Sequence, residues 1–330
     1  MQKKNKIKKE KYKLSSFIKK KVTRQFNILN NITGTKFIKK YHEGKVGNPK
    51  ALYLKSMLLY IRDLFAIYHA WEINKKLKKS FNNNPFFLEI GPGVGNLAVK
   101  LKKLFPGSTI ILIDLPEVNA IQSFYIFKNF PNAKVYRYKE YKRYGINYLF
   151  KKKFDFAVLP FWLINNIQNS SIDLAINIRS MMEMNIKTVQ DYMVHINRIV
   201  KVNGFFYCVN RYEKRSSDYP IRIKDYSFGD NWYFVESKRS KQQIWIHELI
   251  ARKTDLKNAY PPNKVLDELH PLPLKNIFGL LKKILCILKN KIITNDERTY
   301  HKSINAIFRN ISSPLRSKLK IRTRINKIFK

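Results

Sequence analysis

The chain has 330 residues, 45% of them hydrophobic, which suffices for one large α/β domain with extensions or for two small domains. Its two cysteines, Cys208 and Cys286, lie far apart, which disfavours a disulfide scaffold and suits a reducing cytoplasm. No apolar run reaches the roughly 18 residues of a membrane-spanning helix, and no signal-peptide core is evident, so we expect a cytoplasmic protein, or one peripheral at the inner face of the membrane.

The formal net charge of +42 is concentrated at the two ends of the chain. Residues 1–24 hold eleven Lys/Arg against one acid, and residues 274–330 hold fifteen against two. Such arms favour anionic surfaces, either phospholipid head groups or nucleic acid. A composition rich in Lys, Asn and Ile is also what an AT-rich genome produces without selection for binding. We assign residues 1–45 to a basic N-terminal extension.

Residues 46–80 are predicted to form a helical segment that packs on the main domain. The turn sequence VGNP at residues 46–49 precedes a run in which apolar residues recur every three or four positions. These residues are Leu54, Leu58, Ile61, Phe65, Tyr68 and Trp71. An aromatic stripe at helical spacing is more often core than a cover for a cofactor.

The stretch FFLEIGPGVGN at residues 86–96 has the order of a buried strand, a tight turn and a helix start. Gly91, Gly93 and Gly95 stand at alternate positions in the turn, where bare main chain lets a ligand lie close. The N-terminus of the following helix offers free N–H groups and a partial positive charge, which suit a carboxylate or phosphate.

Spacing distinguishes two classes of cofactor that use such a turn. The dinucleotide fingerprint GxGxxG fails in its strict form, because the sixth position counted from Gly91 is Asn96. An acid two residues before the first glycine, here Glu89, resembles instead the pattern of class I S-adenosylmethionine methyltransferases. A second apolar strand, residues 108–114, ends in Asp114, where such folds bind ribose hydroxyls.

The following residues continue the alternation of strands and helices. A helix is predicted from Pro116 onward, and segments 133–138 and 154–161 are both strand-like, with the choice between them left open. Residues 172–178 and 205–210 are further strands around a helix at 187–202, and two more strand-like runs end near residue 251. This order predicts a doubly wound α/β sheet with an antiparallel last strand over residues 81–253.

Residues 254–330 are predicted to be a basic C-terminal extension. After a proline-marked linker, apolar residues between 274 and 292 trace one face of a helix whose other positions carry lysines. A basic amphipathic helix of this kind suits an anionic membrane surface, and packing on the catalytic domain is the alternative.

Together, six segments resemble the sugar O-methyltransferases found with bacterial surface-polysaccharide genes. They are VGNP (46–49), FLEIGPGVGNLA (87–98), IDLPE (113–117), LPFWL (159–163), INIRSMMEM (176–184) and FYCVNR (206–211). The resemblance covers about residues 46–251. It implies a Rossmann-like seven-stranded sheet, S-adenosylmethionine as cofactor, and a sugar or glycan acceptor, free, nucleotide-linked or lipid-linked.

By this resemblance the glycines hold the methionine part of the cofactor and Glu89 orients the turn or the amino group. Asp114 takes the ribose hydroxyls and Leu115 lines the adenine. Asn177 and Ser180, at the carboxyl end of a strand, are expected to contact cofactor and sugar respectively.

A neutral sugar hydroxyl needs a base nearby, and two residues are candidates. Glu183 is the first, with a cap or a salt bridge to the following helix as the equally weighted alternative. His195 is the second, although its place within a helix favours simple packing. Trp162 is predicted to stack on a sugar ring, with a core position as the alternative. No His, Cys and acid spacing predicts a metal site.

Two other functions remain open at this stage. The charge suggests an RNA methyltransferase, but it lies outside the predicted catalytic core and no RNA-binding module is evident, so nucleic acid is not the expected partner. A catalytically inactive methyltransferase fold acting as a membrane-surface scaffold is the third hypothesis, against which the intact glycine turn argues.

Overall fold

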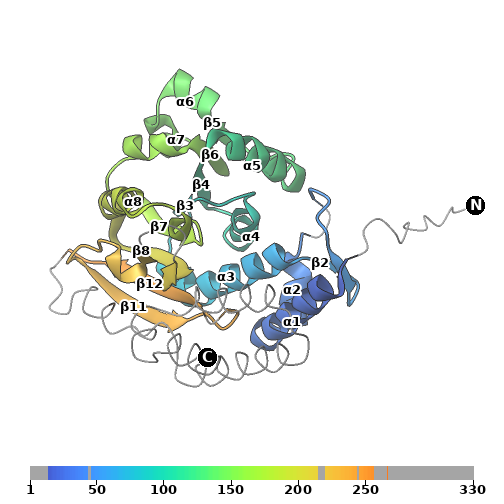
Figure 1. Ribbon diagram of the computed structural model, residues 1–330. Helices are drawn as coiled ribbons and strands as arrows, with labels where there is room; N and C mark the ends of the chain where they lie inside the picture. The colour runs from blue at the N-terminus through green and yellow to red at the C-terminus, as the bar shows by residue number, and fades with distance from the viewer. Residues whose placement is uncertain (1–13, 44–45, 215–219, 244, 256–265, 267–330) are drawn as a thin grey trace, which may run out of the picture.

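An eight-stranded sheet forms the centre of the computed structural model, which describes residues 14–43, 46–214, 220–243, 245–255 and 266. The strands lie in the order β11-β12-β8-β7-β3-β4-β6-β5, visible from bottom to top in Figure 1. Their bounds are β3 (Phe86–Ile90), β4 (Thr109–Asp114), β5 (Val135–Arg137), β6 (Phe156–Pro160), β7 (Ile172–Ile178), β8 (Val200–Arg211), β11 (Trp232–Arg239) and β12 (Ile246–Lys253). Strands β3 to β8 are parallel, and β12 pairs antiparallel with both β8 and β11.

The predicted doubly wound sheet with an antiparallel last strand is confirmed, and it has one strand more than the expected seven. Both of the segments left undecided by the sequence belong to the sheet. β6 lies beside β4, and β5 is added outside β6 as a short edge strand. Residues of β6 are buried throughout, as expected for a strand covered on both faces, whereas the last residue of β5 is exposed.

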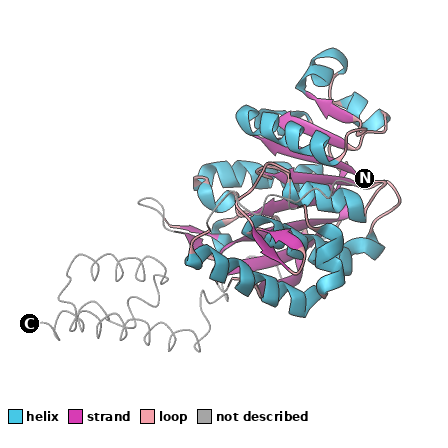
Figure 2. Cartoon of the chain, turned by 90° about the vertical axis from the view of Figure 1, so that its right-hand side faces the viewer, coloured by secondary structure: helices cyan, strands magenta, loops and turns pink. Residues whose placement is uncertain are grey.

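Helices cover both faces of the sheet, giving the layers seen in Figure 2. One face packs against α3 (Ile61–Leu77), α4 (Asn96–Leu104) and α5 (Pro116–Asn129). The other packs against α7 (Asn147–Lys151), the 3-10 segment η2 (Phe161–Asn166) and α8 (Ile186–Ile199), with α6 (Tyr138–Tyr144) beside α7. Short elements complete the described chain: η1 (Lys78–Ser80), η3 (Met181–Glu183), β9 (Glu213–Lys214), β10 (Ile221–Arg222) and η4 (Ile223–Asp225).

The N-terminal part folds onto α3 and forms a core of its own. Helices α1 (Ser16–Thr33) and α2 (Thr35–Tyr41) bury apolar residues against α3. The single long helix predicted from the apolar spacing after residue 50 is wrong in its first part. Strands β1 (Leu52–Leu54) and β2 (Met57–Leu59) pair there as a hairpin, turning through Lys55 and Ser56, which both have positive φ. The helix begins only at residue 61.

A fully buried ion pair joins α3 to α4. The Lys100 Nζ atom lies 2.6 Å from Asp63 Oδ1, and both side chains are 0% exposed. Asp63 also accepts a hydrogen bond from the backbone N–H of Glu43. The pair fixes α3 against the helix that begins at the glycine turn.

None of the helices in the described ranges combines the length and apolar composition that a bilayer crossing requires. The amphipathic helix predicted at 274–292 lies outside the described residues, as do most of the N-terminal basic cluster and the C-terminal extension.

Candidate active site

The glycine turn leaves the carboxyl end of β3 at the middle of the sheet. Gly91, Gly93 and Gly95 have φ values of +65°, +60° and +89°, so each takes a conformation that other residues resist. The Gly91 N–H donates to the carbonyl oxygen of Ile113 on β4 at 2.9 Å. Gly95 is the N-cap of α4, which therefore starts at the turn with its N–H groups free, as the sequence predicts.

A buried polar network holds this turn from the side of β7. The Ser180 hydroxyl and the Asn177 amide both donate to the carbonyl oxygen of Ile90, at 2.9 and 3.0 Å. The Asn210 amide donates to Asn177 Oδ1 at 2.8 Å, so the Asn177 side chain already makes hydrogen bonds at both ends. A Cβ on Gly91 would overlap Ser180. Asn177 and Ser180 thus lie at the predicted place, and their hydrogen bonds are made to the protein.

A cavity of about 510 Å³, which we call the turn cavity, opens beside the glycines. It is lined by Lys21, Ile61, Arg62, Phe65, Ala66, His69, Glu89, Gly91, Pro92, Gly93, Val94, Asn96, Leu97, Ile178, Arg179, Met182, Glu183 and Gln243. These residues come from α1, α3, the end of β3, the glycine turn, the start of α4, the end of β7 with the segment that follows it, and the loop before β12. Such a volume is typical of small-molecule sites.

Glu89 lines the turn cavity, and no described residue forms an ion pair with it. Its side chain is 4% exposed, and its Oε2 atom makes no hydrogen bond within the described chain. Burial, and secondarily the carboxylate of Asp114, raise the pKa of Glu89 to about 8. A buried carboxyl of this kind is suited to a cationic ligand group.

Arginine side chains face the same cavity. Arg62 and Arg179 are close enough that their like charges repel, and burial together with Arg211 and Arg62 lowers the pKa of Arg179. The Arg179 guanidinium lies over the Phe65 ring, 5.6 Å from its centroid, and its backbone has a positive φ of 65°. A strained backbone that carries a charged side chain into a cavity is a frequent feature of functional sites.

His69 completes the wall contributed by α3. Arg62, Phe65 and His69 follow at three- and four-residue spacing, so they share one face of the helix. His69 Nδ1 lies 2.9 Å from the Tyr207 hydroxyl. Burial, aided by Arg179 and Lys238, lowers the pKa of His69 to about 3, so the ring is neutral at pH 7.

Asp114 lies at the end of β4, as predicted, and is tied to the glycine turn. Its Oδ1 accepts from the Leu115 N–H at 2.8 Å. The Gln122 amide of α5 donates both to Asp114 Oδ2, at 3.0 Å, and to the Gly93 carbonyl, at 2.8 Å. Burial raises the pKa of Asp114. Leu115 is 53% exposed, which leaves it free to cover a bound ring.

The other predicted site residues are more dispersed. Glu183 lines the turn cavity and forms an ion pair with Lys214. His195 lies on α8 next to Arg198, and the structure does not bring it to the turn cavity. Trp162 follows β6, whose residue Pro160 is aligned with Asp114, so Trp162 lies on the Asp114 side of the site. It is 41% exposed and packs edge-on against Phe161.

Among the described residues, no group of three or more His, Cys, Asp or Glu side chains is arranged to hold a metal ion.

Comparison with known proteins extends only to the fold. No protein-family model and no curated protein sequence matches the chain. Similar solved structures include geranyl diphosphate methyltransferase in complex with SAM (11% identity, 59% of this chain and 87% of that chain covered, TM-score 0.40). Others are M. capricolum TrmK in complex with S-adenosyl-homocysteine (12%, 74% and 95%, 0.38) and mitomycin 7-O-methyltransferase MmcR (12%, 72% and 67%, 0.35). These values are too low to bear on the reaction.

Sequence reasoning missed Arg62, His69, Gln122 and Asn210. The first two lie in a helix whose apolar spacing is typical of core, and only their shared face with Phe65 indicates a cavity wall. Gln122 and Asn210 act through partners 8 to 33 residues away in sequence, which no local pattern reveals.

Proposed function

We propose that the chain is an S-adenosylmethionine-dependent methyltransferase. The observation that carries the proposal is the pairing, in one cavity beside the glycine turn, of an unpartnered buried carboxyl with two guanidinium groups. Glu89 is complementary to the ammonium group of the cofactor's methionine end, and Arg62 and Arg179 are complementary to its carboxylate. Asp114, held by Gln122, is placed to accept hydrogen bonds from the ribose hydroxyls.

The bound cofactor supplies a methyl group on a positively charged sulfur. The residues of the turn cavity contribute orientation and exclusion of water, because the charge on sulfur disperses as the methyl leaves. Phe65 and Met182 present apolar surface to that centre, while the network under Gly91 keeps the turn in place. Turns that bind NAD have a different glycine spacing, GxGxxG.

The cofactor assignment predicts that Asp114→Ala weakens binding of S-adenosylhomocysteine about tenfold, the typical loss of a charged hydrogen-bond acceptor. Calorimetric titration of the full chain measures this, with NAD as a second ligand. Asp191→Ala, at an exposed position of α8, is the matched control and keeps wild-type affinity. Binding of NAD in place of S-adenosylhomocysteine, or unchanged affinity in Asp114→Ala, contradicts the assignment.

For the acceptor we propose a sugar hydroxyl of a bacterial surface glycan or its precursor. The support is the resemblance of the six segments to sugar O-methyltransferases. One of them, INIRSMMEM, contains Glu183, which lines the turn cavity. The Glu183 side chain is 58% exposed, so its carboxylate is accessible to an acceptor even though it is paired with Lys214. It is the proposed base that takes the hydroxyl proton.

Glu183→Gln is expected to lower the rate of methyl transfer to the glycan acceptor at least a hundredfold, within the usual range for removal of a general base, with S-adenosylhomocysteine affinity retained. The measurement is transfer of labelled methyl from S-adenosylmethionine. Lys214→Gln breaks the same ion pair but keeps the carboxylate, and is expected to keep most of the rate. Equal losses of the transfer rate in the two variants would mean that Glu183 acts only through its ion pair with Lys214 and is not the base.

A further inference from the structure

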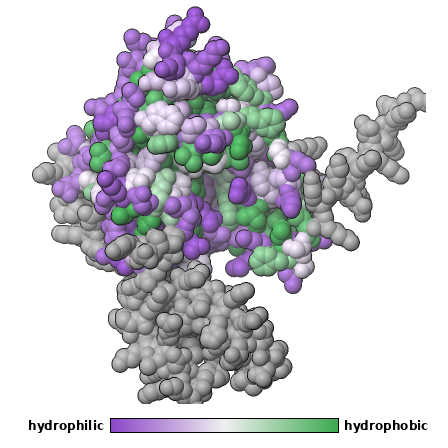
Figure 3. Space-filling view, turned by 45° about the horizontal axis from the view of Figure 1, so that its top comes forward, coloured by the Kyte–Doolittle hydropathy of each residue, from purple (hydrophilic) through white to green (hydrophobic). Residues whose placement is uncertain are grey.

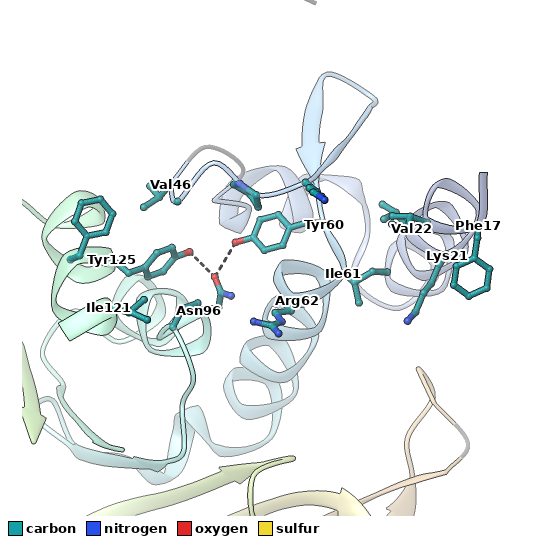
Figure 4. A pocket seen from close by; sticks show the side chains of 16 residues that line it. Phe17, Lys21, Val22, Val46, Tyr60, Ile61, Arg62, Asn96, Ile121 and Tyr125 are labelled. Carbon is teal, nitrogen blue, oxygen red and sulfur yellow. Dashed lines mark hydrogen bonds between the residues drawn. The ribbon is translucent and has the colours of Figure 1, made fainter. Parts of the chain in front are cut away.

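A second cavity, of about 500 Å³, lies next to the turn cavity, and we call it the aromatic cavity. It is lined by Phe17, Ile18, Lys21, Val22, Val46, Gly47, Pro49, Lys50, Tyr60, Ile61, Arg62, Val94, Asn96, Ile121, Phe124 and Tyr125. Figure 4 shows it between α1, the start of α3 and α5. Most of its wall is apolar, so the few cations and polar groups on it indicate which polar part of a ligand the cavity could bind.

The floor of the aromatic cavity is a fixed polar cluster. The hydroxyls of Tyr60 and Tyr125 both donate to Asn96 Oδ1, at 3.1 and 2.6 Å, from opposite sides in Figure 4. Asn96 is 8% exposed, and its Nδ2 group makes no hydrogen bond within the described chain. The cluster therefore offers a ligand the two N–H donors of the Asn96 amide and the remaining lone pairs of two phenol oxygens.

The charge of the aromatic cavity has one sign. Lys21, Lys50 and Arg62 line it, and none of them forms an ion pair with another described residue. None of the described residues on its wall is acidic. Ile121 and Phe124 are each 53% exposed, so the apolar wall continues to the surface. Figure 3 shows hydrophobic patches, in green, among the hydrophilic residues on one face of the molecule.

The aromatic cavity adjoins the turn cavity. Five residues line both: Lys21, Ile61, Arg62, Val94 and Asn96. A ligand in the aromatic cavity therefore approaches the glycine turn from the side of α5, with Arg62 and Asn96 between the two compartments. This is the position required of the second substrate in a transfer reaction.

We propose that the aromatic cavity binds the acceptor, and that the acceptor is an anionic amphiphile in which an apolar chain is joined through a phosphate to the group that is methylated. The inference rests on the proposed methyltransferase function and narrows its acceptor to the lipid-linked class. A free glycan is rich in hydroxyls, each of which needs a polar partner when buried, and this wall supplies few. The apolar wall accommodates the chain, and Lys21 and Lys50, the two lining cations that are not assigned to the cofactor, accommodate the phosphate.

Calorimetric titration of the full chain with decyl phosphate, below its micelle concentration and with S-adenosylhomocysteine already bound, tests the proposal. Decyl phosphate is expected to bind at least tenfold more tightly than decanol and than inorganic phosphate. Tighter binding of UDP-glucose than of decyl phosphate would overturn the lipid-linked class. Displacement of S-adenosylhomocysteine by decyl phosphate would also overturn the proposal, because it would place the probe in the turn cavity.

Two variants locate the binding. Ile121→Asp puts a negative charge at the mouth of the aromatic cavity and is expected to weaken decyl phosphate binding at least tenfold. Val194→Asp makes the same change at a 65% exposed position of α8 and is expected to leave it unchanged. Equal affinities in the two variants would overturn the location. Retained S-adenosylhomocysteine binding with no decyl phosphate binding rejects this inference alone, whereas absent S-adenosylhomocysteine binding rejects the proposed function.

Discussion

Replacing Lys100 with Met is expected to lower the free energy of unfolding by about 3–5 kcal/mol, the usual cost of removing one partner of a buried ion pair. The variant leaves the Asp63 carboxylate fully buried, and among the described residues only the Glu43 N–H then donates to it. Urea denaturation measures the loss as a lower midpoint at unchanged slope. Lys103→Met is the matched control on the same helix, because Lys103 pairs with Glu43 at a partly exposed site, and it is expected to cost less than about 1 kcal/mol.

The double variant Asp63→Leu with Lys100→Met removes both charges and is expected to recover most of the lost stability. Apolar residues of similar volume replace buried ion pairs at little net cost. A double variant as unstable as Lys100→Met would mean that the loss comes from packing around Lys100 and not from the unpaired carboxylate. The outcome bears on the site, because this pair sets α3, which carries Arg62 and His69, against the start of α4.

The glycine turn and Asp114 were predictable because their signals are local. A strand, a turn that requires positive φ and a helix start follow one another within eleven residues, and the acid ends the next strand. The parallel sheet then brings the two strand ends together without further information.

The hairpin at residues 52–59 was not predictable from the same kind of signal. Apolar residues at 54, 58 and 61 satisfy a helical period, and the alternative depends on left-handed backbone at Lys55 and Ser56, which neither residue type signals strongly. The hairpin is favoured over a helix because β2 packs in the core formed with α1 and α3.

The buried side-chain contacts were hidden for a different reason. Asn177 and Ser180 are correctly placed at a strand end, but whether their polar groups turn toward a ligand or toward the Ile90 carbonyl depends on the neighbouring strand. Arg62 enters the turn cavity only because α3 packs on α4. Sequence therefore locates the edge of the sheet where the site forms, and the fold determines which side chains face it.

Glu89→Gln is expected to weaken S-adenosylhomocysteine binding about a hundredfold at pH 8, since a buried charge pair with the ligand's ammonium group is lost. The wild type must deprotonate Glu89 to form that pair. Because its pKa is raised to about 8, affinity is expected to rise about tenfold per unit between pH 6 and 7 and to level off near 8. Titration calorimetry at several pH values measures both effects, and Glu89→Gln is expected to show no such rise.

The free energy of unfolding of the empty wild type is expected to fall as pH rises, whereas its affinity for the ligand is expected to rise. Measuring both therefore separates a binding effect from misfolding. Glu89 holds its proton in the folded chain up to about pH 8 but loses it near 4.5 when unfolded, so the empty wild type loses stability as pH rises between these values. Each pKa unit corresponds to about 1.4 kcal/mol. The neutral amide in Glu89→Gln has no such loss, so the variant is expected to be more stable than wild type at pH 8 while binding less. A less stable variant would contradict the raised pKa of Glu89, and wild-type affinity that falls from pH 6 to 7 would show that Glu89 does not hold the ligand's ammonium group.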